Sequence, residues 1–293
     1  MTYRTLIGLA LPGVLALSAN PARADDSYVQ HKNVVYAEED GIGLLMDVFV
    51  PKGQKNGHGV VDVVSGAYYS DRGKLRDHQQ AQVYQIMCGK GLTVFAVRPG
   101  SITKFCIPEM LKHVQSGIRW VKEHAAEYGI DPAQLGLTGA SAGGNLATLA
   151  MVTADEATRV KAVAVFFPPT DFLDWGGKRL DRSADGTISK HSLAYAFPPG
   201  QTADKKPEEL AEALAAISPA RLVKPGLPPY LTIHGDADTT VPLQQSQKMV
   251  AELKAKGNSA ELIVKPGGTH PWPTINEEVA VLTDWLLKHL LAK

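Results

Sequence analysis

The segment from Leu135 to Asn145 carries the pattern Gly139-x-Ser141-x-Gly143 between a short apolar run and an Ala- and Leu-rich stretch of helical character. This pattern at a strand-to-helix junction is typical of a nucleophile elbow, a sharp turn that exposes the serine hydroxyl. Because that hydroxyl is a weak nucleophile at neutral pH, it needs a base and nearby amides that stabilise negative charge. The pattern therefore indicates Ser141 as a covalent nucleophile. A flexible Gly/Ser linker, the alternative, would lack both flanks.

A carboxylate follows Ser141 at the end of a predicted strand. Tyr230 to His234 is typical of a buried strand, and the turn-rich segment after it contains Asp236 and Asp238. A catalytic serine needs an acid that orients its histidine, and in the fold type of this elbow the chain order is Ser, then Asp or Glu, then His. We expect Asp238 to be that acid. Asp236, the alternative, is better suited to bonding the amides of the turn.

A histidine follows the next predicted strand, Ala260 to Val264. His270 lies there in a Gly- and Pro-rich loop, which gives its imidazole the freedom to reach Ser141. His234 is the main rival, but it ends a strand, where packing or local bonding is expected. The sequence favours His270 as the general base.

The oxyanion of an acyl-transfer reaction also needs amide donors. One is the amide after the nucleophile, here Ala142, and a second comes from the loop after an earlier strand. Val60 to Val64 predicts that strand, and small residues follow it. We expect Ala67 or Tyr68 to be the second donor.

These motifs together resemble the α/β-hydrolase superfamily, and within it the hormone-sensitive-lipase-like and bacterial feruloyl-esterase-like (BD-FAE-like) carboxylesterases. The matching pieces are GASAGGN at 139–145, FFPPTDF at 166–172, ISPARLV at 217–223, HGDADTTVP at 234–242 and GGTH at 267–270. The resemblance implies an α/β-hydrolase fold and a serine carboxylesterase that acts on small acyl or carbohydrate-linked esters through an acyl-enzyme. The expected partner is a small-molecule or oligosaccharide ester, with no metal and no cofactor.

The chain also departs from that pattern. Relatives carry His-Gly-Gly at the oxyanion loop, where this chain has Ser65-Gly66-Ala67-Tyr68. Backbone donors survive such a replacement, but the two tyrosines can reshape the acyl pocket. Tyr69, Trp272 and Phe172 are expected to contact substrate, either by stacking on an aromatic acyl group or a sugar ring or as simple walls. A prolyl-oligopeptidase-like serine peptidase and an inactive hydrolase scaffold used for binding remain the alternatives.

Residues 1–24 have the features of a secretory signal peptide. Arg4 precedes an apolar stretch from Leu6 to Leu17, and Ala22-Arg23-Ala24 forms an Ala-x-Ala cleavage site. We expect an exported protein, periplasmic or extracellular, without stable membrane insertion after processing; a retained anchor is the alternative. Removal of Arg4 and Arg23 takes the formal net charge from 0 to −2. This balance gives no electrostatic basis for binding nucleic acid.

Strands and helices are predicted to alternate in residues 25–293, which favours one α/β-hydrolase domain with a mostly parallel, doubly wound sheet and helices on both faces. Strands are expected at 44–50, 60–64, 92–97, 135–138, 160–166, 230–234 and 260–264. Helices are expected at 75–87, 108–128, 142–152, 207–216, 243–256 and 276–291. Residues 168–224 interrupt the alternation and are a candidate lid or substrate-binding insertion.

Cys88 and Cys106 are the two cysteines of the chain. The predicted strand between them spans about 20 Å, against about 6 Å between the Cα atoms of a disulfide. We therefore expect the two cysteines to stay apart unless the intervening loop doubles back.

Overall fold

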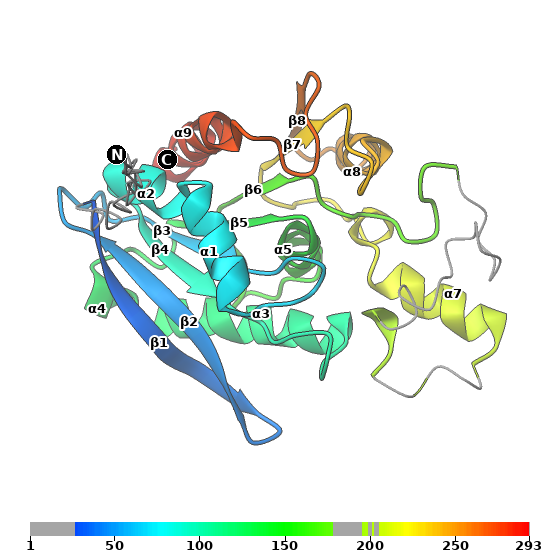
Figure 1. Cartoon of the computed structure of the whole chain (residues 1–293), viewed down its shortest axis with the longest axis horizontal. Coiled ribbons are helices and arrows are strands. Elements are labelled where there is room, and N and C mark those ends of the chain that lie inside the picture. Colours follow the sequence, from blue (N-terminus) through cyan, green and yellow to red (C-terminus); the bar gives the residue numbers. More distant parts are fainter. Residues whose placement is uncertain (1–26, 178–194, 199–200, 202–204, 293) are drawn as a thin grey trace, which may run out of the picture.

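The computed structural model describes residues 27–177, 195–198, 201 and 205–292. In this part of the chain, eight strands form one sheet with the order β1-β2-β4-β3-β5-β6-β7-β8 (Figure 1). They are β1 (Tyr28–Glu39), β2 (Ile42–Pro51), β3 (Gly59–Val63), β4 (Thr93–Val97), β5 (Leu135–Ala140), β6 (Ala162–Phe166), β7 (Tyr230–Gly235) and β8 (Ala260–Lys265). β2 pairs antiparallel with β1 and β4, and the other neighbours are parallel. The expected α/β-hydrolase architecture is confirmed.

Helices cover both faces of this sheet (Figure 1). One face packs against α1 (Arg72–Gln80), α2 (Val83–Gly89) and α9 (Ile275–Leu291), and the other against α3 (Ile107–Glu123), α4 (Ala125–Tyr128), α5 (Ala142–Val152) and α8 (Gln244–Ala255). β3 shows how one strand serves both layers: Val61 and Val63 join the apolar core under α3 and α5, and Val60 joins the core under α2 and α9. Strands buried on both faces are continuous apolar runs, which is why sequence patterns identified them.

Two predicted helices are each divided in the structure. The helix expected at 75–87 is interrupted at Gln82, whose φ of 59° is left-handed, so α1 and α2 are separate. α1 begins earlier than expected because Asp71 caps it, accepting hydrogen bonds from the amides of Gly73 (2.6 Å) and Lys74 (3.2 Å). The helix expected at 108–128 is divided at His124 into α3 and α4.

The edge strand β1 was not predicted. Its sequence is largely polar, and even its apolar residues Val29 and Val35 are 46% and 58% exposed. Because β1 lies at the edge of the sheet and pairs only with β2, it lacks the buried apolar run that marks the central strands.

The candidate insertion is described in part, with residues 178–194, 199–200 and 202–204 outside the described chain, as is the signal peptide expected at 1–24. Its helix α7 (Pro207–Ala216) is followed by the 3₁₀ helix η1 (Pro219–Arg221). Asp171 near one end of the insertion pairs with Arg221 near the other end (2.8 Å) and with Lys248 of α8 (2.7 Å). These ion pairs hold the two ends beside α8, and the lid role remains a prediction.

The two cysteines are buried and are not joined by a disulfide, as expected from their separation along the fold. Cys88 lies in α2, and Cys106 precedes α3, where burial raises the pKa of its thiol to about 11. Within the described chain, no helix is long and apolar enough to cross a membrane.

Candidate active site

Ser141 occupies a strained turn between β5 and α5. Its backbone has φ 53° and ψ −119°, a conformation that non-glycine residues rarely adopt. The neighbouring glycines permit the turn because a Cβ atom on Gly139 would lie 2.5 Å from the Gly143 carbonyl oxygen, and one on Gly143 would lie 2.1 Å from the Val63 carbonyl oxygen. The turn has the conformation expected of a nucleophile elbow.

The structure brings Ser141, His270 and Asp238 together in one hydrogen-bonded chain. The His270 Nε2 atom lies 2.8 Å from the Ser141 Oγ atom, and the His270 Nδ1 atom lies 2.6 Å from Asp238 Oδ2. The three residues follow β5, β7 and β8, whose carboxyl ends lie at the same edge of the parallel sheet. This arrangement can move a proton from the serine hydroxyl to an imidazole that a carboxylate orients.

The Asp238 carboxylate is held by several donors. Its Oδ1 atom accepts from the amides of Thr240 (2.8 Å) and Val241 (2.9 Å), and His234 Nε2 lies 3.3 Å from Oδ2. Burial acts to raise the pKa of Asp238, but hydrogen bonds from His234, His270 and the Val241 amide outweigh it and hold that pKa well below its ordinary value. Asp238 is therefore a carboxylate throughout the neutral range.

The two rival residues have structural contacts instead. Asp236 accepts a hydrogen bond from the Gly267 amide at 2.6 Å, which joins the turn after β7 to the loop after β8. His234 is fully buried and lies 2.7 Å from Ser246 Oγ and 2.8 Å from the Val241 carbonyl oxygen. Neither residue is bonded to Ser141.

The expected oxyanion loop, residues 65–69, forms a tight turn beside the start of α5. Gly66 and Tyr69 exchange two backbone hydrogen bonds of 2.9 Å, and Ala67 (φ 48°) and Tyr68 (φ 62°) between them are both left-handed. No atom of the described chain accepts a hydrogen bond from the Ala67 or Tyr68 amide. Both are therefore available to a ligand.

The Ala142 amide is also available among the described residues. The amides on either side of it are occupied, because Ser141 donates to the Phe166 carbonyl oxygen and Gly143 to that of Ser65, each at 3.0 Å. The second of these bonds joins the oxyanion loop to the first turn of α5. The two expected sources of oxyanion donors are thus neighbours.

The three residues expected to contact substrate differ in exposure. Tyr69 is 43% exposed, whereas Phe172 is 5% and Trp272 is 4% exposed. Trp272 packs against Phe166 and Phe167, and its Nε1 atom donates to a glutamate of α9 at 2.7 Å. In this structure Trp272 and Phe172 belong to the core, so of the three side chains Tyr69 alone is accessible to substrate. The sequence showed that these residues are aromatic and follow strand ends, but not which way they point.

Asn145 connects more of the site than its place in the motif indicated. Its Nδ2 atom donates to the carbonyl oxygens of Pro169 (2.9 Å) and Ile217 (3.3 Å), which lie near the two ends of the insertion. Its Oδ1 atom accepts from the Tyr68 hydroxyl at 3.1 Å. A buried asparagine at the end of the GASAGGN motif was the available signal, but its partners are distant in sequence.

A second carboxylate–imidazole pair joins β3 to α1, on the face of the sheet that packs against α1, α2 and α9. Asp62 of β3 is 1% exposed, and its Oδ2 atom lies 2.7 Å from His78 Nδ1 and 3.0 Å from the Tyr84 hydroxyl. Burial acts to lower the pKa of His78, but the charge and hydrogen bond of Asp62 raise it above its ordinary value. Sequence patterns did not identify this pair.

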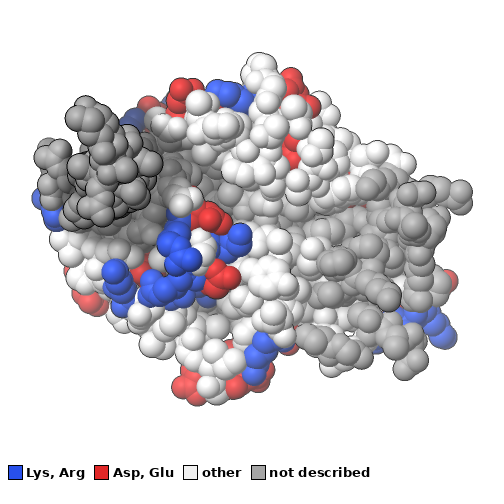
Figure 2. Space-filling model, in the orientation of Figure 1, with Lys and Arg blue, Asp and Glu red and all other residues white. Residues whose placement is uncertain are grey.

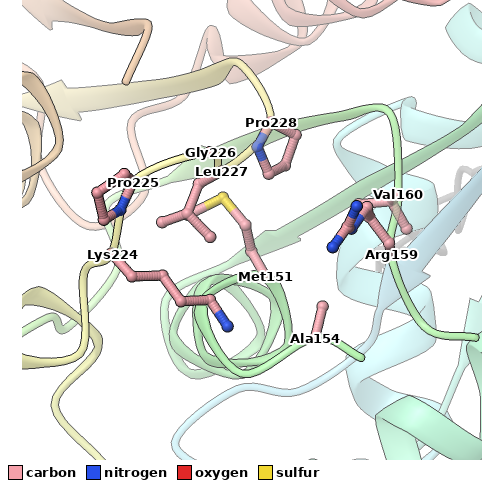
Figure 3. A pocket seen from close by; sticks show the side chains of 9 residues that line it. All are labelled: Met151, Ala154, Arg159, Val160, Lys224, Pro225, Gly226, Leu227 and Pro228. Atoms are coloured by element: carbon pink, nitrogen blue, oxygen red, sulfur yellow. The ribbon is translucent and has the colours of Figure 1, made fainter. Parts of the chain in front are cut away.

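A surface cavity lies away from Ser141, at the opposite end of α5. Figure 3 shows Met151 at its centre, with Arg159 and Lys224 on either side. Because α5 runs from Ser141 toward this cavity, the two are separated by the length of the helix. Among the described residues, no group of His, Cys, Asp or Glu is arranged to hold a metal ion.

A family model described as BD-FAE matches residues 46–253, which include β3, the elbow and Asp238. The chain belongs to the BD-FAE family. The match ends before His270, so the assignment of His270 to the site rests on its contacts in the structure.

Similar proteins with known names include esterases. The chain is 29% identical over 157 residues to the probable carboxylic ester hydrolase LipM of Mycobacterium tuberculosis, covering 50% of this chain and 34% of LipM. It is 24% identical over 248 residues to the probable isoprenylcysteine alpha-carbonyl methylesterase ICMEL1 of Arabidopsis thaliana, covering 82% of this chain and 50% of ICMEL1. The chain thus spans half or less of these two relatives.

Solved structures share the fold across most of this chain. A truncated form of a carbohydrate esterase from gut microbiota matches with a TM-score of 0.78 at 24% identity, covering 92% of this chain and 99% of the other. Esterase 2 of Thermogutta terrifontis, phosphonylated by sarin, matches with a TM-score of 0.69 at 23% identity, covering 89% and 96%. At these identities the likeness establishes the fold.

Proposed function

We propose that this BD-FAE family member is a serine carboxylesterase that hydrolyses small acyl or carbohydrate-linked esters through an acyl-enzyme. The observation that carries the proposal is the chain Ser141–His270–Asp238, with hydrogen bonds of 2.8 and 2.6 Å. The names of the relatives, which include ester hydrolases, support the same reaction class.

The proposed reaction begins when His270 Nε2 takes the Ser141 proton and Oγ attacks the ester carbonyl. The negative oxygen of the tetrahedral intermediate accepts hydrogen bonds from the Ala142 amide and from Ala67 or Tyr68. Asp238, held ionised, stabilises the imidazolium. His270 then gives its proton to the leaving alkoxide, and the alcohol departs.

The second half of the reaction repeats these steps with water. His270 takes a proton from the water, the hydroxide attacks the acyl-enzyme, and His270 returns the proton to Ser141 as the carboxylic acid leaves. The chain's own residues supply each proton transfer.

The surface near the site supports a largely uncharged substrate. Figure 2 shows acidic and basic side chains together over α1, whereas the surface between α1 and the loops after β7 and β8 is mostly free of charged groups. A neutral acyl ester of an alcohol or a sugar suits such a surface, and one solved neighbour bears the name carbohydrate esterase. The signal-peptide pattern of residues 1–24 supports an exported enzyme that meets such esters outside the cytoplasm.

The test is hydrolysis by residues 25–293 of p-nitrophenyl esters from acetate to laurate, of methyl ferulate and of acetylated xylan. Ser141→Ala is expected to lower turnover by about 10⁶-fold. A fluorophosphonate probe should label the wild type and not this variant. Equal turnover by both proteins would contradict the proposal. Ester binding without labelling or turnover would favour the inactive scaffold, and amide-bond cleavage without ester cleavage would favour the peptidase.

A further inference from the structure

The oxyanion loop of this chain is held in an unfavourable backbone conformation without glycine at its two critical positions. Ala67 and Tyr68 both have positive φ, a region that side chains disfavour and glycine enters freely. Some other interaction must therefore stabilise the turn in this chain. The Tyr68 side chain is in a position to provide it.

The Tyr68 hydroxyl reaches across to α5. It donates to Asn145 Oδ1 at 3.1 Å, and the tyrosine is 3% exposed. Burial is the main cause that raises the pKa of Tyr68 well above its ordinary value, and the nearby Tyr195 adds to it. The hydroxyl therefore keeps its proton and remains a donor. The ring also lies 4.6 Å, centroid to centroid, from that of Tyr195 in the insertion.

Asn145 is itself fixed in place. It is fully buried on the first turns of α5, and its Nδ2 atom is engaged by the Pro169 and Ile217 carbonyl oxygens. An amide with both donors engaged cannot rotate without losing them, so its Oδ1 atom faces Tyr68. The hydroxyl of Tyr68 is therefore anchored to α5, the helix that follows Ser141.

We infer that Tyr68 is a positioning residue, whose hydroxyl acts through Asn145 to hold the Ala67 and Tyr68 amides toward the oxyanion. The Ser65 carbonyl, bonded to the Gly143 amide at 3.0 Å, fixes the start of the loop. At its tip the Ile102 amide donates to the Tyr68 carbonyl oxygen at 2.9 Å, and the Tyr68 hydroxyl adds the anchor to α5. The inference rests on the proposed esterase reaction. It assigns the Tyr68 side chain a role separate from that of its backbone amide.

The decisive variant is Tyr68→Phe, which deletes the hydroxyl and keeps the ring. We expect kcat to fall about 10- to 100-fold with KM changed less than about 3-fold, a smaller loss than deleting an oxyanion donor outright. The matched control is Tyr36→Phe. Tyr36 is also buried, at 6% exposure, and donates one hydrogen bond of 3.1 Å to the Arg98 carbonyl oxygen, but it lies on the edge strand β1. Rates are expressed per active site titrated with fluorophosphonate, which removes the contribution of misfolded protein.

A second variant separates loss of the hydroxyl from general damage to the core. Tyr68→Gly loses the ring and the hydroxyl together, but glycine adopts the required φ without strain. We expect it to melt at a lower temperature than Tyr68→Phe and yet to turn over faster. If Tyr68 had a purely structural role, the less stable variant would also be the slower one. A Tyr68→Phe enzyme with the kcat of the wild type, or a Tyr68→Gly enzyme no faster than Tyr68→Phe, overturns the inference alone. Absence of Ser141-dependent turnover in the wild type overturns the proposed function and the inference with it.

Discussion

Two aspartate–histidine pairs of nearly equal geometry occur in this fold, and they differ in what surrounds them. The pair Asp238–His270 and the pair Asp62–His78 join a carboxylate oxygen to a histidine Nδ1 atom at 2.6 and 2.7 Å. In the first pair, the other ring nitrogen meets the Ser141 hydroxyl. In the second pair, His78 lies on α1, and the Tyr84 hydroxyl of α2 donates to the same carboxylate oxygen of Asp62.

Because of this difference, we expect the first pair and not the second to take part in catalysis. Asp238 and His270 lie in loops at the carboxyl ends of parallel strands, where a nucleophile on a neighbouring strand end and free amides can be added. Asp62 lies within β3, where its neighbours are other strands and a helical layer. Position relative to the strand ends separates the two pairs.

The strongest test of this comparison removes one carboxylate charge from each pair. Asp238→Asn is expected to lower kcat by about 10⁴-fold, because the amide favours the wrong tautomer of His270. Asp62→Asn is the matched control and should keep kcat within a few-fold while lowering the melting temperature. Steady-state kinetics on p-nitrophenyl acetate decide the matter. Similar losses in both variants would show that the pairs are functionally linked.

The next test disturbs the turn that holds Ser141, the residue that His270 of the first pair contacts. Gly143→Ala places a Cβ atom 2.1 Å from the Val63 carbonyl oxygen, a backbone atom that cannot move freely. We expect a loss of about 3 kcal/mol or more in the free energy of unfolding, together with loss of labelling at Ser141. The control is Gly89→Ala, where nothing lies within 4 Å of the new atom. Urea unfolding measures both, and a Gly143→Ala protein as stable as the control would contradict the geometry.

A smaller effect is expected from the pH dependence of the buried pair. The raised pKa of His78 means that the folded state binds its proton more tightly than the unfolded state does. The stabilisation is therefore complete below the unfolded pKa of about 6.5 and is lost as pH rises through the higher folded value. The melting temperature of His78→Gln should fall below that of the wild type by more at about pH 5.5 than at about pH 9. Calorimetry at the two pH values tests this, and a pH-independent difference would refute it.

The smallest expected effect concerns the rival acid beside the first pair. Asp236→Ala removes one hydrogen bond to the Gly267 amide. We expect a loss of about 1 kcal/mol or less in stability and a kcat within about 2-fold of the wild type. A fall of several hundred-fold, measured in the same assay, would make Asp236 part of the machinery and reopen the choice of acid.

The sequence predicted the parts of the site that follow from strand order. Ser141, Asp238 and His270 each follow an apolar run typical of a buried strand, and parallel strands place such positions at one edge. The side-chain directions of Trp272 and Phe172 could not be predicted in this way, because an aromatic residue after a strand can enter the core as easily as the cleft. The direction of a side chain depends on packing partners distant in sequence, and no local pattern contains them.

Features that depend on several distant segments were likewise beyond prediction. Gln82 breaks a helical pattern whose periodicity continues across it, and nothing in the local sequence marks its left-handed backbone. The partners of Asn145 are separated from it by 24, 72 and 77 positions. Contacts of that range are fixed by the whole fold, so the sequence could show the motif but not its connections.

The hydrogen bonds from Asn145 to the Pro169 and Ile217 carbonyl oxygens have a consequence for how this fold can diversify. The Asn145 amide group bonds the chain near the points where it leaves the core and returns to it, and the ion pairs of Asp171 with Arg221 and Lys248 hold the same two ends. We therefore expect that a change in the length of the segment between them leaves the attachment points in register with the elbow. Closing a longer loop between fixed ends costs only about 0.6 kcal/mol for each doubling of its length. Asn145 thus helps to keep the two ends of the insertion at fixed positions beside the elbow.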